Sequence, residues 1–337
     1  MTNKTKQIGK PLTSRDLAAL IEVSQSAVSR AFTPGSSISP DLRERILKGA
    51  RDYGYQPNAI ASMLTTRRTN IVGIVVSDMQ NPFYPLLIEK LTQGLQRVGL
   101  QSLLFNITPG ASIEEQLVAI RTYNVDAVVV ISATILNAKS LAWATEGRKA
   151  LLLNRIGSDD IPAICIDNEV GARAIVDHLY DVGHRRVAYV AGLTKTGVGQ
   201  ARYSAFTARL AERGMRLAGT ASREAYSYDA GQICTRTLLQ EKPDAIFFAS
   251  DVLALGGLDA LKEAGVAGQI GVVGFDDIPM AAWPAYSLTT YRQPVNDIVE
   301  TAVRILTDAT PASPKLNSLA GELIIRASST PQRVIPE

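Results

Sequence analysis

Four outward-facing polar side chains lie on one short segment near the start of the chain. In Ser24–Ala31 the apolar residues recur at helical spacing and leave the opposite face to Gln25, Ser26, Ser29 and Arg30. Glutamine can pair with adenine, arginine with guanine, and serine with a base or a phosphate. The face also lacks the Glu and Lys pairs of an ordinary solvated helix. It therefore suits base reading in DNA, although a small helical domain with a polar surface is the plainer interpretation.

Three helical patterns would position that face. Thr13, followed three residues later by Asp16, can cap a first helix, and Ser24 is a good N-cap for the second. Ser39-Pro40 begins a third with a cap followed by proline. Two short helices joined by a tight turn and braced by a third form a helix-turn-helix, whose second helix enters the major groove.

Charge is distributed unevenly along the 337 residues, although the net charge is only +3. The segment up to Arg68 carries eleven basic and five acidic side chains, a balance of +6, and the remainder carries −3. A basic head on a mildly acidic body is typical of a DNA-binding module joined to a domain of another function.

Beyond the head, the sequence SRDLAALIEVSQSAVSRAF followed by YQPNAIASML resembles the head and hinge of the LacI/GalR family of bacterial transcriptional regulators. The resemblance covers nearly the whole chain. It implies a hinge helix that folds on operator DNA, with Leu64 wedged into the minor groove and Asn58 and Ala61 beside it. We therefore expect the DNA-binding residues to be Thr13, Ser24, Gln25, Ser26, Ser29, Arg30, Asn58, Ala61 and Leu64. Thr33 and Thr65 depart from common family residues, which leaves the operator sequence open.

From Ile71 onward, near-continuous Val, Ile and Leu strands alternate with amphipathic helices, which predicts parallel sheets covered on both faces. The rhythm restarts after Asp167, so we expect two doubly wound lobes in tandem with a ligand cleft between them. The expected strands include 102–105, 224–226, 288–291 and 322–326. Expected helices include 113–123, 140–146, a last long one at 295–308, and one beginning at Val252.

The full prediction is α/β: an all-α helix-turn-helix head with a hinge helix, then a body like periplasmic binding proteins. Residues 1–55 would form the DNA-binding domain, 56–68 the hinge helix and linker, and 69–337 the effector-binding and dimerisation domain. Within this domain, the family architecture implies that lobe 1 spans about 69–167 and 294–321. Lobe 2 would then span about 168–293 and 322–330.

The resemblance also implies an effector site at the carboxyl ends of the strands. Arg202 and Asp276 match the arginine and aspartate that grip the effector in sugar- and purine-responsive relatives. An arginine fork and a carboxylate can satisfy adjacent hydroxyls, and Phe83 and Tyr84 could stack on a ring. Further candidates are Asn154, Arg155, Tyr226, Ser250 and Asp251. Three have structural alternatives: Arg202 could form a surface ion pair, Asp276 could cap the next segment, and Asp251 could cap the helix beginning at Val252.

Other patterns suggest no chemistry. Gly192–Gly197 has the glycine spacing of a P-loop, but Val198-Gly199 replaces the required Lys-Ser/Thr. His178 and His184 lack a nucleophile nearby in sequence and are interpreted as structural or surface residues. Cys165 and Cys234 stand without partners at ligand spacing, so we expect neither a disulfide nor a metal. No enzyme and no cofactor is predicted.

We therefore expect a homodimeric, sequence-specific regulator, most simply a repressor, of a metabolic operon. It would bind a pseudo-palindromic operator and respond to a sugar, sugar acid or sugar phosphate. Control by a protein partner is one alternative. A transporter's solute-binding protein is another, but the basic head argues against it, and the N-terminus lacks the apolar core of a secretory signal. Without a run of ~20 apolar residues there is no membrane span, so a bacterial cytoplasmic, nucleoid-associated location is expected.

Overall fold

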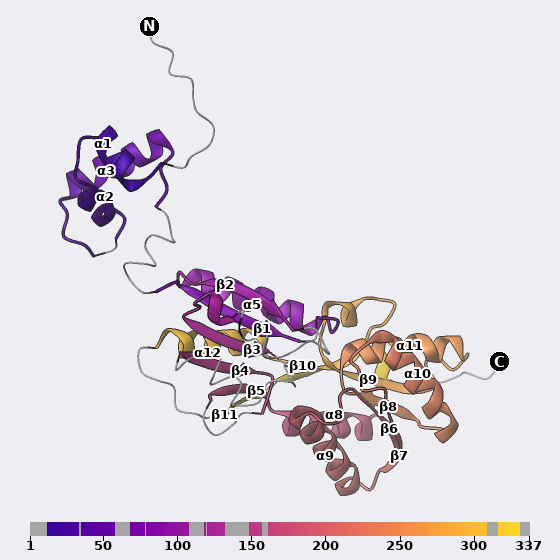
Figure 1. Ribbon diagram of the computed structural model, residues 1–337. Coiled ribbons are helices and arrows are strands. Elements are labelled where there is room, and N and C mark those ends of the chain that lie inside the picture. Colours follow the sequence, from indigo (N-terminus) through magenta and orange to yellow (C-terminus); the bar gives the residue numbers. More distant parts are fainter. Residues whose placement is uncertain are drawn as a thin grey trace. The chain divides into compact units, whose positions relative to one another are not determined.

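The computed structural model describes residues 12–33, 35–57, 68–77, 79–107, 118, 120–131, 148–156, 161–308 and 316–330. These residues belong to two compact units, Met1–Thr69 and Asn70–Glu337 (Figure 1). The expected hinge residues Asn58, Ala61 and Leu64 lie outside the described residues, as does the expected helix at 140–146. Of the helix expected at 113–123, the described residues 118 and 120–122 are helical. No described helix is long and apolar enough to cross a membrane.

Three helices form the smaller unit: α1 (Ser14–Leu20), α2 (Gln25–Ala31) and α3 (Pro40–Tyr53). Each begins at the cap expected from the sequence. Thr13 and Asp16 form a reciprocal capping box, Ser24 accepts from the Ala27 amide, and Ser39 accepts from the Leu42 amide. The apolar faces of the helices meet in one small core of Leu17, Ala18, Ala27, Val28, Ala31, Ile46, Ala50 and Tyr55.

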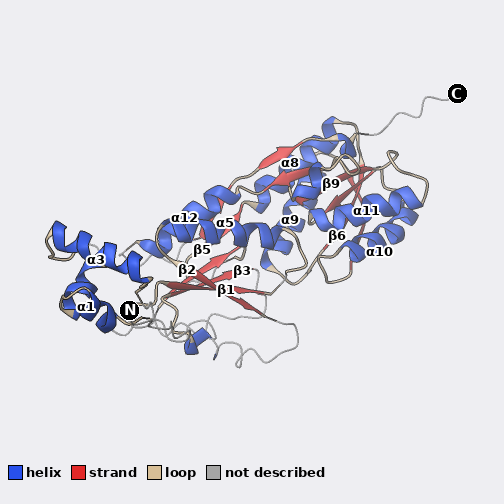
Figure 2. Cartoon of the chain, turned by 90° about the horizontal axis from the view of Figure 1, so that it is seen from above, coloured by secondary structure: helices blue, strands red, loops and turns tan. Residues whose placement is uncertain are grey.

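The first sheet of the larger unit is six-stranded and parallel, in the order β11-β5-β4-β3-β1-β2. Its strands are β1 (Ile71–Val76), β2 (Gln101–Asn106), β3 (Ala127–Ile131), β4 (Lys149–Leu153), β5 (Ala163–Ile166) and β11 (Leu316–Leu319). Helix α5 (Phe83–Arg97) lies beside α12 (Val295–Thr307) (Figure 2), and Gly94 allows this close approach because a Cβ there would lie 2.8 Å from Val299 Cγ1.

The second sheet has the order β12-β10-β9-β8-β6-β7, in which β12 alone is antiparallel to its neighbour. Its strands are β6 (Arg186–Ala191), β7 (Arg216–Ser222), β8 (Ala245–Phe248), β9 (Gly271–Asp276), β10 (Thr289–Arg292) and β12 (Glu322–Ile324). The helices of this lobe are α8 (Asn168–Asp181), α9 (Gly197–Glu212), α10 (Tyr228–Leu238) and α11 (Asp251–Glu263).

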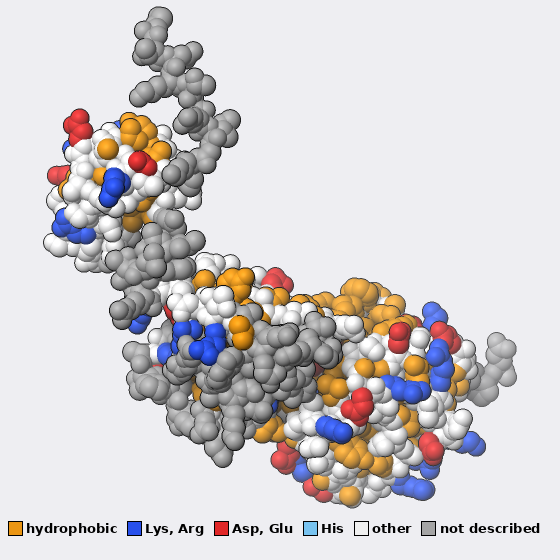
Figure 3. All heavy atoms as spheres, in the orientation of Figure 1, with side chains coloured by type: hydrophobic (Ala, Val, Ile, Leu, Met, Phe, Trp, Pro, Cys, Tyr) orange, Lys and Arg blue, Asp and Glu red, His pale blue; other side chains and the backbone are white. Residues whose placement is uncertain are grey.

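The chain therefore returns to the first sheet through α12 and β11 and ends in the second sheet with β12. Strands buried on both faces explain the near-continuous apolar runs, since β3, β5, β8 and β9 are buried along their whole length. On the face drawn in Figure 3, Lys and Arg side chains of the larger unit are interspersed with Asp and Glu. The predicted α/β architecture of two doubly wound lobes is confirmed.

Two strand predictions differ from the structure. The strand expected at 224–226 is wrong: Glu224 has a φ of 52°, and the strand is β7, which ends at Ser222. The sequence of β7 does not predict a strand, because β7 lies at the edge of its sheet and carries the small, partly exposed residues LAGTAS. The strand β11 was also missed, since its residues alternate between exposed and half-buried positions and LNSL has little apolar character.

Candidate functional site

A cleft between the two lobes collects most of the predicted effector residues. Its volume is about 250 Å³, and its walls come from the carboxyl ends of strands in both sheets. Asn81 and Tyr84 follow β1, Asn154 and Arg155 follow β4, and the remaining wall belongs to lobe 2. There the lining residues are Leu193, Lys195, Thr196, Gly197, Val198, Arg202, Tyr226, Ala249, Ser250 and Asp276, with Ile156 opposite from lobe 1. Parallel sheets place ligands at this edge.

Arg202 is buried at the base of the cleft rather than exposed. Its Nε and Nη2 donate to Asn168 Oδ1 at 3.1 and 2.9 Å, and its Nη1 donates to the Ala249 carbonyl. The guanidinium carbon lies 3.5 Å from the centroid of the Phe275 ring. Three of the five donors are thereby used, and no described carboxylate lies within salt-bridge distance of Arg202. The alternative of a surface ion pair is therefore wrong.

Asp276 faces the same cleft from the end of β9. Its Oδ1 accepts from Gln293 Nε2 at 2.6 Å, while Oδ2 has no hydrogen-bond partner among the described residues. Burial raises the pKa of Asp276, and the neighbouring Asp251 carboxyl raises it further; Arg202, Gln293 and Asn81 lower it by less. An unpartnered buried oxygen is costly, so a hydroxyl-bearing ligand placed here would gain its full hydrogen bond.

Two other lining groups also lack partners among the described residues, namely Asn154 Oδ1 and Ser250 Oγ. Asn154 Nδ2 donates to the Tyr84 hydroxyl at 3.2 Å, which joins the loop after β4 to α5. Burial lowers the pKa of Arg155, which nevertheless stays charged because an arginine ordinarily titrates far above neutrality. The cleft thus offers acceptors from Asp276 and Asn154, donors from Arg202 and Arg155, and an adaptable serine hydroxyl.

Backbone strain marks the same place. Asn154 has a φ of 50°, Asp276 of 135° and Asp277 of 57°, conformations that L-residues rarely adopt. Asp277 is held there because its carboxylate accepts from Arg292 and Arg326, each at 2.7 Å. Such strained residues gather at ligand sites, where the surrounding structure holds them in place.

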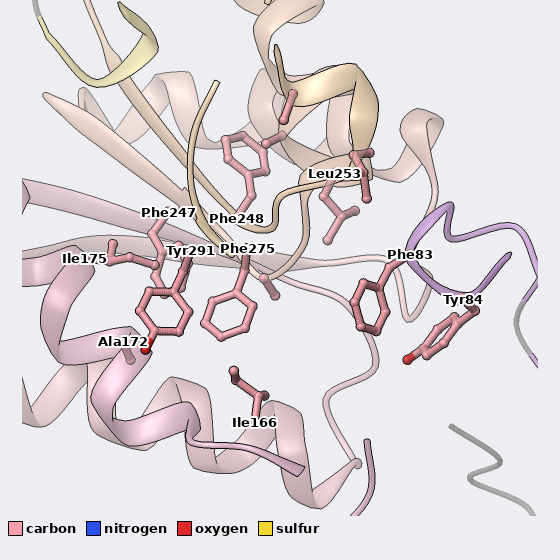
Figure 4. Packing of buried hydrophobic residues seen from close by; sticks show 14 of the residues in the cluster. Phe83, Tyr84, Ile166, Ala172, Ile175, Phe247, Phe248, Leu253, Phe275 and Tyr291 are labelled. Carbon is pink, nitrogen blue, oxygen red and sulfur yellow. The ribbon is translucent and has the colours of Figure 1, made fainter. Parts of the chain in front are cut away.

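Two predicted effector residues do not reach the cleft. Phe83 is only 1% exposed and packs into the core, edge-on to Tyr84 at 5.5 Å between ring centroids (Figure 4). Asp251 is fully buried, and its carboxylate accepts from the Ile278 amide at 2.9 Å and from Thr290 Oγ1 at 2.5 Å. It does not cap α11 either, since the helix begins at Asp251 itself and its N-cap residue is Ser250.

Sequence reasoning missed the loop from Leu193 to Val198. Its sequence lacks the Lys-Ser/Thr of a P-loop and predicts no binding site, yet the loop forms one wall of the cleft. Thr196 caps α9 by accepting from the Gly199 amide at 3.1 Å, so the helix begins at the cleft. The position of the loop could have predicted this role, because the loop directly follows a buried strand of a doubly wound sheet. Asn81 was missed in the same way, although it lies in the VSDMQNPFY segment that carried the resemblance.

The head presents the expected polar face. Gln25, Ser26, Ser29 and Arg30 are all exposed on α2. Gln25 Nε2 donates to Ser14 Oγ at 3.1 Å, and Arg30 Nε donates to the Ser26 carbonyl at 3.3 Å. Thr13 and Ser24 are also exposed, each with its side chain accepting from a helix amide. The side chains of Thr13 and Ser24 are therefore engaged in helix capping.

The histidines and cysteines have structural surroundings. His178 Nε2 and His184 Nε2 lie 2.8 Å from the hydroxyl and the carbonyl oxygen of Ser329, respectively. Both rings thereby tie the short 3-10 turn Ala327–Ser329 to lobe 2. Cys165 and Cys234 are buried free thiols. Within the described ranges, no group of three or more His, Cys, Asp or Glu side chains is arranged to hold a metal ion.

Comparison with known proteins agrees with this geometry. Residues 176–329 match the model of the periplasmic binding protein-like domain. The chain is 28% identical to the ribose operon repressor of Halalkalibacterium halodurans, across 87% of this chain and 89% of that protein. It is 29% identical to the HTH-type transcriptional regulator CelR of Thermobifida fusca, across 87% and 90%.

Solved structures give the same picture. The lac repressor dimer bound to operator and the anti-inducer ONPF superposes with a TM-score of 0.83 at 24% identity, covering 95% of this chain and 99% of that one. The complex of CelR with cellobiose superposes with a TM-score of 0.69 at 26% identity, covering 94% and 100%. With the helix-turn-helix head and the two-lobed body already described, the chain is similar over most of its length to DNA-binding transcriptional regulators such as the ribose operon repressor and CelR, and it shares the fold of the lac repressor.

Proposed function

We propose that this regulator is a homodimeric repressor of a metabolic operon, released or recruited by a sugar-like effector in the cleft between its lobes. The observation that carries the proposal is the concentration of buried, unpartnered polar atoms there. Asp276 Oδ2, Ser250 Oγ and Asn154 Oδ1 have no hydrogen-bond partner among the described residues, and these residues line one cavity together with Arg202, which keeps two of its five donors unused. Adjacent hydroxyls of a sugar, sugar acid or sugar phosphate would satisfy these groups.

Charge and fold together suggest a function for each segment of the chain. We propose residues 1–55 as the DNA-binding domain, 56–68 as the hinge and linker, and 69–337 as the effector and dimerisation domain. Two heads of a dimer would read two half-sites of a pseudo-palindromic operator, with Gln25, Ser26, Ser29 and Arg30 toward the bases. Leu64 of each hinge would open the central step, with Asn58 and Ala61 beside it. Such a protein acts in the bacterial cytoplasm, at the nucleoid.

Effector control needs two states with different affinity for the ligand. The cleft takes residues from both lobes, so a ligand between them would favour one relative orientation of the lobes. Because the lobes are joined by three chain crossings, that reorientation would move lobe 1, to which the linker connects. The ligand would thereby change the affinity for DNA by linkage.

The test begins with the operator. Selection of double-stranded DNA from a random pool should enrich a pseudo-palindrome, and Arg30→Ala should lower affinity for it at every salt concentration. The purified protein is then heated with a panel of sugars, sugar acids, sugar phosphates and purines. A ligand at about 100 times its dissociation constant stabilises the folded body by roughly 2.7 kcal/mol.

A matched pair of variants tests whether the ligand that shifts the melting temperature binds in the cleft. Asp276→Asn should abolish the ligand-induced shift, whereas Asp229→Asn makes the same change at an exposed site on α10 and should preserve it. If operator binding is intact but no small molecule shifts the melting temperature, the effector proposal is wrong. Control by a protein partner then becomes the better explanation. Absence of any enriched DNA would instead favour a solute-binding role.

A further inference from the structure

A second cavity of about 260 Å³ adjoins the effector cleft inside lobe 2. It lies between the carboxyl ends of β6 and β7 and the first turns of α9. Three tyrosines supply its aromatic walls, and three residues of β7 supply its far side: Tyr189, Tyr203, Tyr226, Thr220, Ala221 and Ser222. Leu193, Tyr226 and Ala249 line both this inner chamber and the effector cleft. The two spaces are therefore neighbours with a shared wall.

Tyr226 is the main part of that wall. A Cβ built on Gly192 would lie 2.1 Å from Tyr226 Cε1 and 2.4 Å from Cζ, so the ring lies directly against the glycine backbone. Gly192 is what permits this position, since any side chain there would displace the ring. Tyr226 lies in the irregular segment that follows the end of β7.

The chamber also borders a polar group without a partner. The Tyr189 ring stacks on Phe206 at 5.2 Å and meets Phe247 edge-on at 5.3 Å between centroids. Its hydroxyl is closed off from solvent and has no hydrogen-bond partner among the described residues. Burial of a phenol without a partner costs free energy in the empty protein. Because the hydroxyl is closed off, a ligand in the chamber would reach it only if the surrounding side chains moved.

The chemistry of the lining points to an uncharged ring. None of the residues that line the chamber carries a charge, which disfavours a carboxylate or phosphate. Tyrosine faces bind sugar rings and aryl groups by stacking, and Thr220 and Gln200 can hydrogen-bond to a ring hydroxyl. Size points the same way: each cavity alone falls below the ~300 Å³ lower end of ordinary ligand pockets, while the two joined lie within that range.

We propose that the inner chamber is a second subsite of the effector site and binds the second, uncharged ring of a two-ring effector such as a disaccharide. The inference rests on the proposed function, because the first ring would occupy the cleft beside Arg202 and Asp276. Tyr226 would lie between the rings.

The experiment is calorimetric titration of the full-length protein with cellobiose, maltose and lactose, and with glucose and galactose as one-ring probes. The two-ring ligand that binds should do so at least tenfold more tightly than its own monosaccharide. Ala191→Leu adds bulk on the face of β6 that carries Tyr189 and lines the chamber, and it should reduce that advantage to less than threefold while leaving monosaccharide affinity within twofold. Ala218→Leu makes the same change on the neighbouring strand β7, outside both cavities, and serves as the control.

The outcomes separate the two proposals. If monosaccharides bind as tightly as disaccharides, or if Ala191→Leu behaves like Ala218→Leu, the chamber holds water only and the subsite proposal fails. The cleft proposal survives that result provided that Asp276→Asn still abolishes binding. If neither class of sugar binds at all, both proposals fail. A ligand-bound crystal structure with the second ring pointing toward solvent would overturn the subsite in the same way.

Discussion

The buried carboxyl pair Asp251 and Asp276 should make both folding and effector binding depend on pH. Burial is the largest cause that raises the pKa of each group above its ordinary value of 3.8. The Asp251 charge raises the pKa of Asp276 further, and Asp277 raises that of Asp251. Hydrogen bonds and the Arg202 charge oppose these effects without cancelling them. The folded protein therefore retains protons that the unfolded chain releases.

The sign of the pH dependence follows directly. Above about pH 4 the unfolded carboxyls are ionised while the folded pair still binds protons, so the free energy of unfolding falls as pH rises. The fall continues until the folded pair ionises, and each proton contributes at most ~1.4 kcal/mol per pH unit. Asp276→Asn removes one titrating group and the charge that opposes ionisation of Asp251. The stability of the variant relative to the natural protein should therefore increase with pH, by on the order of 1 kcal/mol per unit.

Other groups titrate in the opposite sense, so the difference between two proteins must be measured. Burial lowers the pKa of His178, which adds stability as pH rises toward its ordinary value of 6.5. Burial raises the pKa of Asp177, but hydrogen bonds from Arg209 and Arg213 together lower it by more, and hydrogen bonds from arginines also lower the pKa of Glu212. These contributions are common to the natural protein and the variant, and they cancel in the difference.

Guanidinium chloride unfolding at pH 5, 6, 7 and 8 measures that difference. Asp229→Asn, an exposed site, is the control and should track the natural protein at every pH. A difference curve that stays flat from pH 5 to 8 would mean that Asp276 is already ionised in the fold, and the reasoning would be refuted. Effector binding offers a second readout, since hydroxyl donors favour the ionised carboxylate. Titration in buffers of different ionisation enthalpy should then show proton release, with affinity rising up to ~tenfold per pH unit.

Four further changes test other parts of the structure. Arg202→Ala should lower the free energy of unfolding by about 3 kcal/mol or more, seen in chemical denaturation, because Asn168 loses the donor to its buried oxygen. Gly256→Ala should destabilise by ~1–3 kcal/mol, since its Cβ would lie 2.0 Å from the Tyr228 carbonyl oxygen, outweighing the gain of ~1 kcal/mol in helix propensity. Ser24→Ala should cost the head about 1 kcal/mol, measured by hydrogen exchange of its amides. Tyr189→Phe should leave the melting temperature unchanged or raise it, because the hydroxyl that is removed has no partner among the described residues.

Much of the fold was readable from local patterns. The caps Thr13, Ser24 and Ser39 predicted the starts of three helices, because a capping side chain bonds to an amide only two or three residues away. The buried strands were readable because both of their faces are covered, so every position is apolar. Edge strands such as β7 and β11 lack that signal, and their pairing depends on partners far away in sequence.

Fewer of the site residues could be predicted from the sequence. Resemblance pointed to Arg202 and Asp276, Tyr226 was a further candidate, and a loop at the carboxyl end of a strand was expected to face the cleft. The sequence alone could not decide which side of a loop or helix turns inward. Phe83 turned into the core, and Asp251 bonds to a backbone amide 27 residues away rather than to a ligand. Only the packing of two sheets brings Asn154, Ser250 and Asp276 around one cavity, because these contacts join segments that no local pattern connects.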